Sequence, residues 1–302
     1  MDLNAWAKDR VLALDAVARP WAQRGRLRGF AYEFLLFGLK QAWACLFGGL
    51  LLVLLVATRL WWPADAPLAR YDLLVLCAVG LQVLLLASRL ERPDEARVIL
   101  VFHAVGTAME IFKTAQGSWI YPEASVLRIG GVPLFSGFMY AAIGSYIARI
   151  WRLMDLRFER YPPRWAPWLL ALAAYVNFFT HHHLPDIRLA LFALSILAFA
   201  PTRVVFTPDH APRRMPLLLG FALVALFIWI AENVGTFAAA WTYPEQRDGW
   251  RPVSAGKLGS WYLLMLLSFV LVSLVHARQV PHPRRVATEP RRYDLWAGRL
   301  SR

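Results

Sequence analysis

The feature that most constrains the fold is a series of long apolar runs separated by short charged stretches. The runs are roughly 18–25 residues long, which is the length a helix needs to cross about 30 Å of hydrocarbon. Hydrophobic residues make up 58% of the chain, whereas soluble proteins contain about 45–50%. The sequence therefore predicts an all-α fold, a polytopic bundle of transmembrane helices.

We expect about eight spans in this bundle. The first apolar stretch begins near Phe30 and carries Glu33, Lys40 and Gln41 in its early turns, so it either spans once or re-enters the membrane. The fifth and sixth spans are joined by the short segment HHHLPD, in which Pro185 favours a tight reversal. The predicted spans are 35–59, 71–89, 97–116, 133–151, 166–183, 187–205, 216–238 and 258–276.

The charged loops predict an orientation. If the N-terminus is cytoplasmic, about three-quarters of the 33 Lys and Arg residues fall in cytoplasmic segments, the bias that inner loops carry. We therefore expect a multi-pass protein of the cytoplasmic membrane with both termini inside. The bias accounts for most of the net charge of +13, so lipid and not nucleic acid is the expected partner. Residues 1–29 are predicted as an amphipathic helix on the membrane face, and residues 279–302 as a basic cytoplasmic tail.

A short motif occurs twice. EIFKTAQGSWIYPE, residues 110–123, aligns without a gap with ENVGTFAAAWTYPE, residues 232–245, and the same offset pairs Gly137 with Gly259. It also carries the third and fourth predicted spans onto the seventh and eighth. We predict two four-helix parallel repeats related by a pseudo-two-fold axis along the membrane normal. The predicted repeats are residues 30–155 and 156–278.

Acidic residues inside the repeated motif are the candidate site. Glu110 and Glu232 lie within apolar spans, where a carboxylate is costly unless it faces a cavity or a partner. On the third span His103, Thr107 and Thr114 follow helical spacing with Glu110 and form one polar stripe. We expect both halves to contribute to one outward-facing pocket, with Glu110 and Glu232 as its catalytic residues. The predicted substrate-binding residues are His103, Thr114, Trp119, Tyr121, Glu123, His181, His182, Asn233, Thr236, Trp241, Tyr243 and Glu245.

These features also have structural interpretations. The repeated Trp, Tyr and Pro are typical of the headgroup region of a membrane. Glu110 and Glu232 could be hydrogen-bond partners that hold the two halves together, and Lys113 could neutralise an acid.

The sequence predicts neither a metal nor a cofactor. Consecutive helical residues point about 100° apart, so His181, His182 and His183 cannot all ligate one ion without a break in the helix. No phosphate-binding loop, Gly-rich dinucleotide turn or Gly-x-Ser-x-Gly elbow occurs. Cys45 and Cys77 lie in apolar runs and are expected to be packed thiols, not a disulfide.

Several motifs resemble one bacterial membrane family. FLLFGLKQAWACLFGGLLL, YVNFFTHHHLPDIR, WIAENVGTFAAAWTYPEQ and the two W-x-Y-P-E copies are similar to the family catalogued as domain of unknown function 817. The resemblance runs from about Arg28 to His276. It implies a multi-pass bacterial membrane protein and no particular activity.

A second resemblance covers only EIFKTAQGSWIYPEASVLRIGGVPLFSGFMYA. This stretch is similar to membrane carotenoid hydratases and small lycopene cyclases, in which an acid is followed by aromatic residues and Gly-Val-Pro. Trp119 stands where a Tyr is usual, and Ala124 and Gln246 follow the two loop glutamates where the cyclases have paired acids. The resemblance implies proton chemistry on an isoprenoid.

The leading hypothesis is an acid–base membrane enzyme acting on a lipid-like or isoprenoid, carotenoid-like substrate. Glu110 and Glu232 would donate and accept the proton, because alkene protonation needs a carboxylic acid held in an apolar site. Aromatic faces such as Trp119 and Tyr243 would stabilise a carbocation. Two alternatives remain open: an ion-coupled transporter built from parallel repeats, and a membrane assembly or sensor protein without chemistry. The oligomeric state is not predicted.

Overall fold

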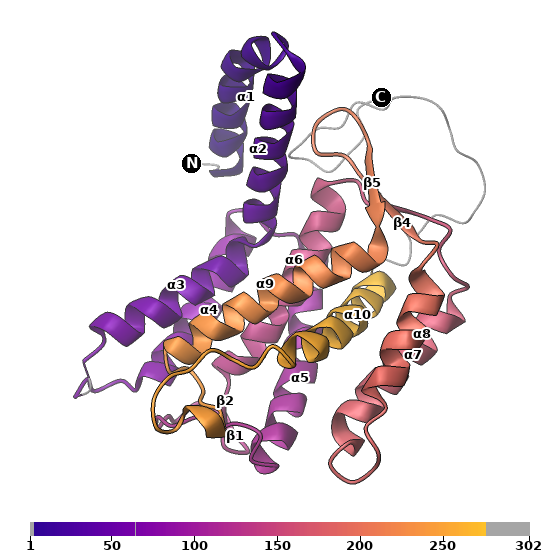
Figure 1. Ribbon diagram of the computed structural model, residues 1–302. Coiled ribbons are helices and arrows are strands. Elements are labelled where there is room, and N and C mark those ends of the chain that lie inside the picture. The colour runs from indigo at the N-terminus through magenta and orange to yellow at the C-terminus, as the bar shows by residue number, and fades with distance from the viewer. Residues whose placement is uncertain (1–2, 64, 276–302) are drawn as a thin grey trace.

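The computed structural model describes residues 3–63 and 65–275, and these fold mainly as helices (Figure 1). The basic tail predicted for 279–302 lies outside the described residues. The helices are α1 (Leu3–Ala22), α2 (Arg26–Ala44), α3 (Leu46–Trp61), α4 (Arg70–Ala87), α5 (Pro93–Ala115), α6 (Phe135–Leu153), α7 (Trp165–Thr180), α8 (Arg188–Phe199), α9 (Leu217–Phe237), the short 3₁₀ helix Pro244–Gln246, and α10 (Lys257–Val275). The strands are β1 (Arg128–Ile129), β2 (Val132–Pro133), β3 (Arg157–Glu159), β4 (Arg203–Phe206) and β5 (Arg213–Pro216).

Membrane-length helices are fewer than the sequence predicted. In the described part of the chain, α4, the Glu95–Ala115 part of α5, and α9 are long and apolar enough to cross a membrane. A fourth span is possible only if α2 and α3 count as one bent segment. The prediction of eight spans is therefore not supported. A helix lies at each predicted position, but α7 has 16 residues and α8 only 12, whereas a crossing needs about 20.

The first apolar stretch is bent and does not form one straight helix. Helices α2 and α3 meet at Cys45 at an angle of 68°. Helix α2 packs beside α1 as a hairpin that projects from the remaining helices (Figure 1). The polar residues noted in the sequence lie on α2, where Lys40 donates to the Thr207 carbonyl at 3.1 Å. The bend therefore separates a partly polar helix from an apolar one.

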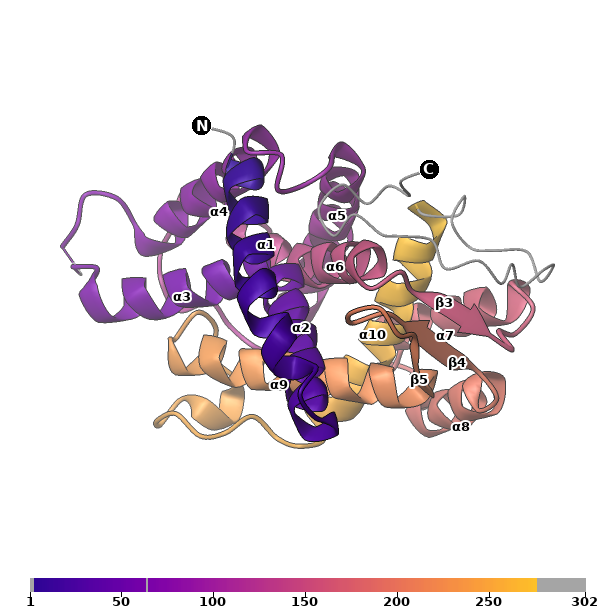
Figure 2. The same ribbon diagram turned by 90° about the horizontal axis from the view of Figure 1, so that it is seen from above.

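The end of the sixth predicted span forms a strand of a small antiparallel sheet and not a helix. The sequence predicts this span to residue 205, but α8 ends at Phe199 and β4 begins at Arg203. Pro201 follows the helix, and the β-branched Val204 and Val205 favour a strand. Strand β4 pairs with both β3 and β5, so it joins two charged segments that are far apart in the sequence (Figure 2).

The centre of the molecule is the pair α5 and α6, against which α10 and α3 pack. Close approach is possible because small residues face large ones across the contact. A Cβ added to Gly106 would lie 2.6 Å from Tyr140 Cβ, and one added to Gly144 would lie 2.7 Å from a Phe102 ring carbon. Neither distance is compatible with a real side chain, so the helix spacing requires glycine.

The Gly106→Ala variant is expected to be less stable than the wild type by about 1–3 kcal/mol, because overpacking forces Tyr140 or the helix to move. Gly80→Ala is the matched control. Nothing lies within 4 Å of a Cβ at Gly80 in the middle of α4, so alanine should stabilise the helix by up to about 1 kcal/mol. Denaturation in mixed micelles measures both changes, and a loss at Gly80 as large as that at Gly106 would contradict the packing argument.

A fully buried ion pair ties the α4–α5 connection to α6. The Arg149 and Glu91 side chains are 0% exposed, and Arg149 Nη2 lies 3.3 Å from Glu91 Oε1. The Ser145 hydroxyl donates to the same oxygen at 3.1 Å, and the Gln82 amide donates to Glu91 Oε2. Removing one partner of such a buried ion pair destabilises the fold, because the other charge remains buried and uncompensated.

Candidate functional site

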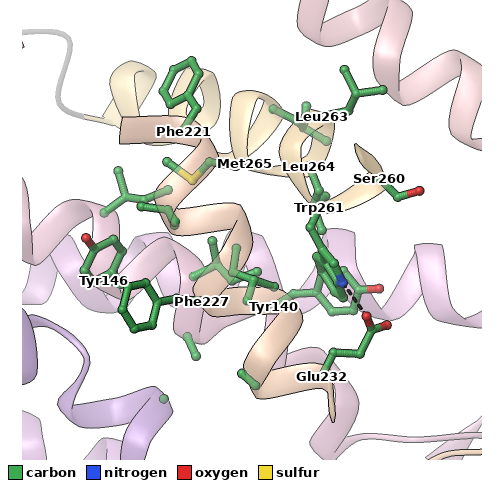
Figure 3. A pocket seen from close by; sticks show the side chains of 18 of the residues that line it. Tyr140, Tyr146, Phe221, Phe227, Glu232, Ser260, Trp261, Leu263, Leu264 and Met265 are labelled. Carbon is green, nitrogen blue, oxygen red and sulfur yellow. Dashed lines mark hydrogen bonds between the residues drawn. The ribbon is translucent and has the colours of Figure 1, made fainter. Parts of the chain in front are cut away.

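A large cavity of about 1180 Å³ lies between the helices, with walls from α2, α3, α5, α6, α7, α9 and α10 (Figure 3). Most of its lining is apolar, including Met265, Phe221 and Phe227. Its charged groups gather where α5, α7 and α9 end and where α8 and α10 begin, while Gln41 and Tyr146 bond each other on another wall. The cavity therefore has the form expected for an amphipathic molecule, with a long apolar part and one polar end.

Glu110 on α5 is 5% exposed and accepts three hydrogen bonds at this polar end. Trp119 Nε1 and the Tyr121 hydroxyl each donate to Oε2 at 2.6 Å. The Tyr140 hydroxyl donates to Oε1 at 2.7 Å. The indole N–H can only donate, so the arrangement fits a carboxylate that accepts at both oxygens.

Glu232 on α9 is 3% exposed and has fewer donors. The Trp261 indole donates to Oε2 at 2.6 Å, as the dashed line in Figure 3 shows, and the Tyr243 hydroxyl donates to Oε1. Tyr243 stands eleven residues after Glu232, as Tyr121 does after Glu110. The repeated motif thus bends back in both copies to place a tyrosine on its own glutamate.

The loops that follow Glu110 and Glu232 in the two copies of the motif pair with each other. The Ile120 amide donates to the Thr242 carbonyl at 3.0 Å, and the Thr242 amide donates to the Ile120 carbonyl at 2.9 Å. Beside this bridge the Trp119 and Tyr243 rings meet edge to face, 5.9 Å apart. Burial raises the pKa of Tyr121 and of Tyr243 well above the usual value, so both hydroxyls keep their protons and donate.

Lys113, one turn beyond Glu110, contacts two histidines and not an acid. Its ammonium lies 3.1 Å from His181 Nε2 and 2.8 Å from His182 Nε2, and over the Phe178 ring. His181 Nδ1 lies 2.9 Å from the Asn177 carbonyl, which can only accept, so Nδ1 carries the hydrogen and Nε2 accepts from Lys113. Burial, and then the charge of Lys113, lower the pKa of His182.

A second lysine, Lys257, begins α10 at the same end of the cavity. Its ammonium lies 4.3 Å from the Tyr243 ring centroid and 5.4 Å from that of Trp119. No carboxylate within the described residues lies within 4.0 Å of it or of Lys113. Arg188 also lines the cavity, but Asp186 pairs with it.

The predicted site residues divide into two groups. Nine line the cavity: Glu110, Trp119, Tyr121, His181, His182, Glu232, Trp241, Tyr243 and Glu245. The remaining five lie outside the cavity lining: His103, Thr114, Glu123, Asn233 and Thr236.

The five residues outside the lining have local explanations. Glu123 pairs with Arg70 at 2.5 Å. Asn233 Oδ1 accepts from the Val253 amide, and Thr236 accepts from the Trp250 indole. His103 packs against Phe138, with its Nδ1 and the Thr114 hydroxyl buried without partners among the described residues. Of the polar stripe predicted on α5, Glu110 lines the cavity, whereas His103 and Thr114 do not.

The sequence pattern did not indicate four cavity residues: Lys113, which lies inside the acidic motif, and Tyr140, Lys257 and Trp261, which lie outside it. A signal existed for Tyr140, since the repeat offset pairs it with Tyr262. The two copies differ there, because Tyr262 bonds Ser195 and the preceding Trp261 reaches Glu232. In the described part of the chain, no three His, Cys, Asp or Glu side chains gather as a metal site.

Comparison with known proteins gives a family. The family described as protein of unknown function (DUF817) matches residues 33–269. The uncharacterized protein YoaT of Bacillus subtilis (strain 168) is 45% identical over 238 residues, which cover 78% of this chain and 89% of that protein. A solved chain of a cross-linked MvINS trimer has 14% identity and a TM-score of 0.44, and the match covers 62% of this chain and 96% of that one. The chain therefore belongs to the DUF817 family.

Proposed function

We propose that this protein binds a lipid-like molecule in its cavity and acts on it by acid–base chemistry, with Glu232 as the group that transfers the proton. The observation that carries the proposal is the position of two buried carboxylates, Glu110 and Glu232, on the wall of one large apolar cavity. A buried acid at an apolar site is the usual means of holding a proton ready for transfer.

The two glutamates have different roles in this proposal. Glu110 accepts from Trp119, Tyr121 and Tyr140, which favours its ionised form and fixes its position. Glu232 accepts from only two donors and keeps lone pairs for a proton. The aromatic rings beside it would stabilise positive charge on an isoprenoid substrate, which is the specific substrate class we propose.

We further propose a multi-pass protein of the cytoplasmic membrane with both termini inside, built from two repeats related by a pseudo-two-fold axis. The reciprocal bridge between Ile120 and Thr242 supports this arrangement, because the two residues are equivalent in the repeat. Gly137 and Gly259, also equivalent, are both sites where an added Cβ would meet a neighbouring side chain. The β3–β4 pairing supports it too, because it joins two segments expected on the same membrane side.

The test compares lipid extracts from four strains that carry the wild type, Glu232→Gln, Glu159→Gln or no protein. Glutamine keeps the shape of Glu232 but cannot take up a proton. A lipid that the wild type alters, in mass by addition of water or in retention time by isomerisation, should therefore stay unaltered in the Glu232→Gln strain. Glu159 in β3 is the matched control, since it is a half-exposed carboxylate paired with Arg214 outside the cavity. Liquid chromatography with mass spectrometry of the extracts gives the result and the substrate.

The pattern across the four strains decides between the hypotheses. A lipid alteration that persists with Glu232→Gln would exclude this residue as the proton-transferring group. Identical lipids in all four strains would reject the enzyme and favour transport of the bound molecule, which uptake into proteoliposomes would then measure.

A further inference from the structure

The polar end of the cavity contains a buried cation, Lys113, with no carboxylate of the described residues within 4.0 Å of its ammonium. Lys113 is 5% exposed, lines the cavity, and is held by the neutral Nε2 atoms of His181 and His182. Burying an ammonium is costly unless an anion or several acceptors compensate for lost water. Two imidazoles satisfy two of its three N–H groups and none of its charge.

Two further cations lie near Lys113 at this end, and Glu232 and Glu245 attract one of them, Lys257. Lys257 and Arg188 both line the cavity and repel Lys113. Arg188 is held at the cavity by Asp186 and donates to the Ser260 hydroxyl at 3.3 Å. Asp186 attracts Lys113, but it is already bonded to Arg188 and Asn177. The charge of Glu110, although near in sequence, is met by its own three donors.

We propose that Lys113, His181 and His182, with Lys257 and Arg188 beside them, bind the phosphate head group of a lipid whose chain occupies the apolar part of the cavity. This proposal rests on the proposed function and names the class of its substrate. A phosphate offers several acceptor oxygens, which suits cations that converge from α5, α8 and α10. The third N–H of Lys113 and the N–H groups of Arg188 would bond these oxygens.

The arrangement also explains the histidines. Two neutral imidazoles orient the ammonium without cancelling its charge, whereas a carboxylate in their place would cancel it. The His181 and His182 rings lie 4.2 Å apart, and His181 is fixed by the Asn177 carbonyl at the end of α7. The lysine is therefore positioned by two acceptors that carry no negative charge.

The experiment uses the full-length protein in dodecyl maltoside micelles, which contain no phosphate, with four probes: dodecyl phosphate, dodecanol, dodecyltrimethylammonium and inorganic phosphate. Dissociation constants come from the rise in unfolding temperature with probe concentration. Dodecyl phosphate should bind the wild type most tightly. Lys113→Met, which keeps the length of the side chain, should weaken it by about 10- to 100-fold, as expected for a lost charged hydrogen bond, and leave dodecanol unchanged.

The control variant is Lys40→Met. Lys40 is another lysine on an apolar helix, but it bonds the Thr207 carbonyl and does not line the cavity. It should leave every dissociation constant unchanged. Lys113→Arg should restore most of the affinity for dodecyl phosphate, which shows that charge and not folding is responsible.

Each other outcome overturns a different statement. Equal binding of dodecyl phosphate by wild type and Lys113→Met would reject the head-group site while leaving the lipid cavity of the proposed function intact. Inorganic phosphate binding as tightly as dodecyl phosphate would show a site for free anion. Failure of both dodecyl phosphate and dodecanol to bind would reject the lipid cavity itself.

Discussion

Replacing Arg149 by Met is expected to lower the free energy of unfolding by about 3–5 kcal/mol, because it leaves Glu91 as a buried carboxylate without its cation. Ser145 and Gln82 still donate to Glu91, but neither carries charge. The measurement is unfolding in mixed micelles of a mild detergent and sodium dodecyl sulfate, followed by far-ultraviolet circular dichroism.

Two variants test whether the unpaired charge causes this loss. Glu91→Gln combined with Arg149→Met removes both charges, so it should recover much of the stability. Arg214→Met is the control, because it breaks an exposed ion pair. Its partner Glu159 lies 3.1 Å away, and since Arg214 is 67% and Glu159 43% exposed, water can solvate the carboxylate and the loss should be at most about 1 kcal/mol. A double variant no more stable than Arg149→Met would attribute the loss to packing.

The sequence predicted the positions of the helices well and their extents less well. Apolar runs indicate where α4, α5 and α9 lie because a continuous apolar helix is visible in composition alone. The same signal did not separate α8 from β4, since apolar residues lie on both sides of a boundary marked only by Pro201, Thr202 and Arg203. The bend at Cys45 was left open, because it depends on how α2 and α3 pack and not on a local breaker.

The site was predictable where the chain repeats itself. The paired motif pointed to Glu110, Glu232, Tyr121 and Tyr243, and the structure places all four at the cavity. Lys257 and Trp261 were missed because they belong to α10, which folds back onto α9 only in three dimensions. No spacing in the sequence relates them to the acids. The alternative in which Lys113 neutralises an acid finds no ion pair among the described residues, since the lysine contacts the two histidines that follow α7.

Glu110→Leu is expected to be the most destabilising change at the site, by about 3–5 kcal/mol, because three donors lose their acceptor together. Each buried donor left without a partner costs about 1–3 kcal/mol. Glu232→Leu should cost less, about 2–3 kcal/mol, because it leaves only Tyr243 and the half-buried Trp261 without an acceptor. Unfolding in mixed micelles gives both values.

Glu110→Gln separates the acceptor role of this residue from its charge. The amide oxygen can take the place of Oε2 and accept from Trp119 and Tyr121, while the amide nitrogen donates to the Tyr140 hydroxyl, which then turns to accept. The loss should therefore be about 1 kcal/mol, well below that of leucine. If glutamine were as destabilising as leucine, the charge of Glu110 and not its hydrogen bonds would hold the loops. Its role beside Glu232 would then be electrostatic, because a charge that stabilises the fold also acts on a proton held by its neighbour.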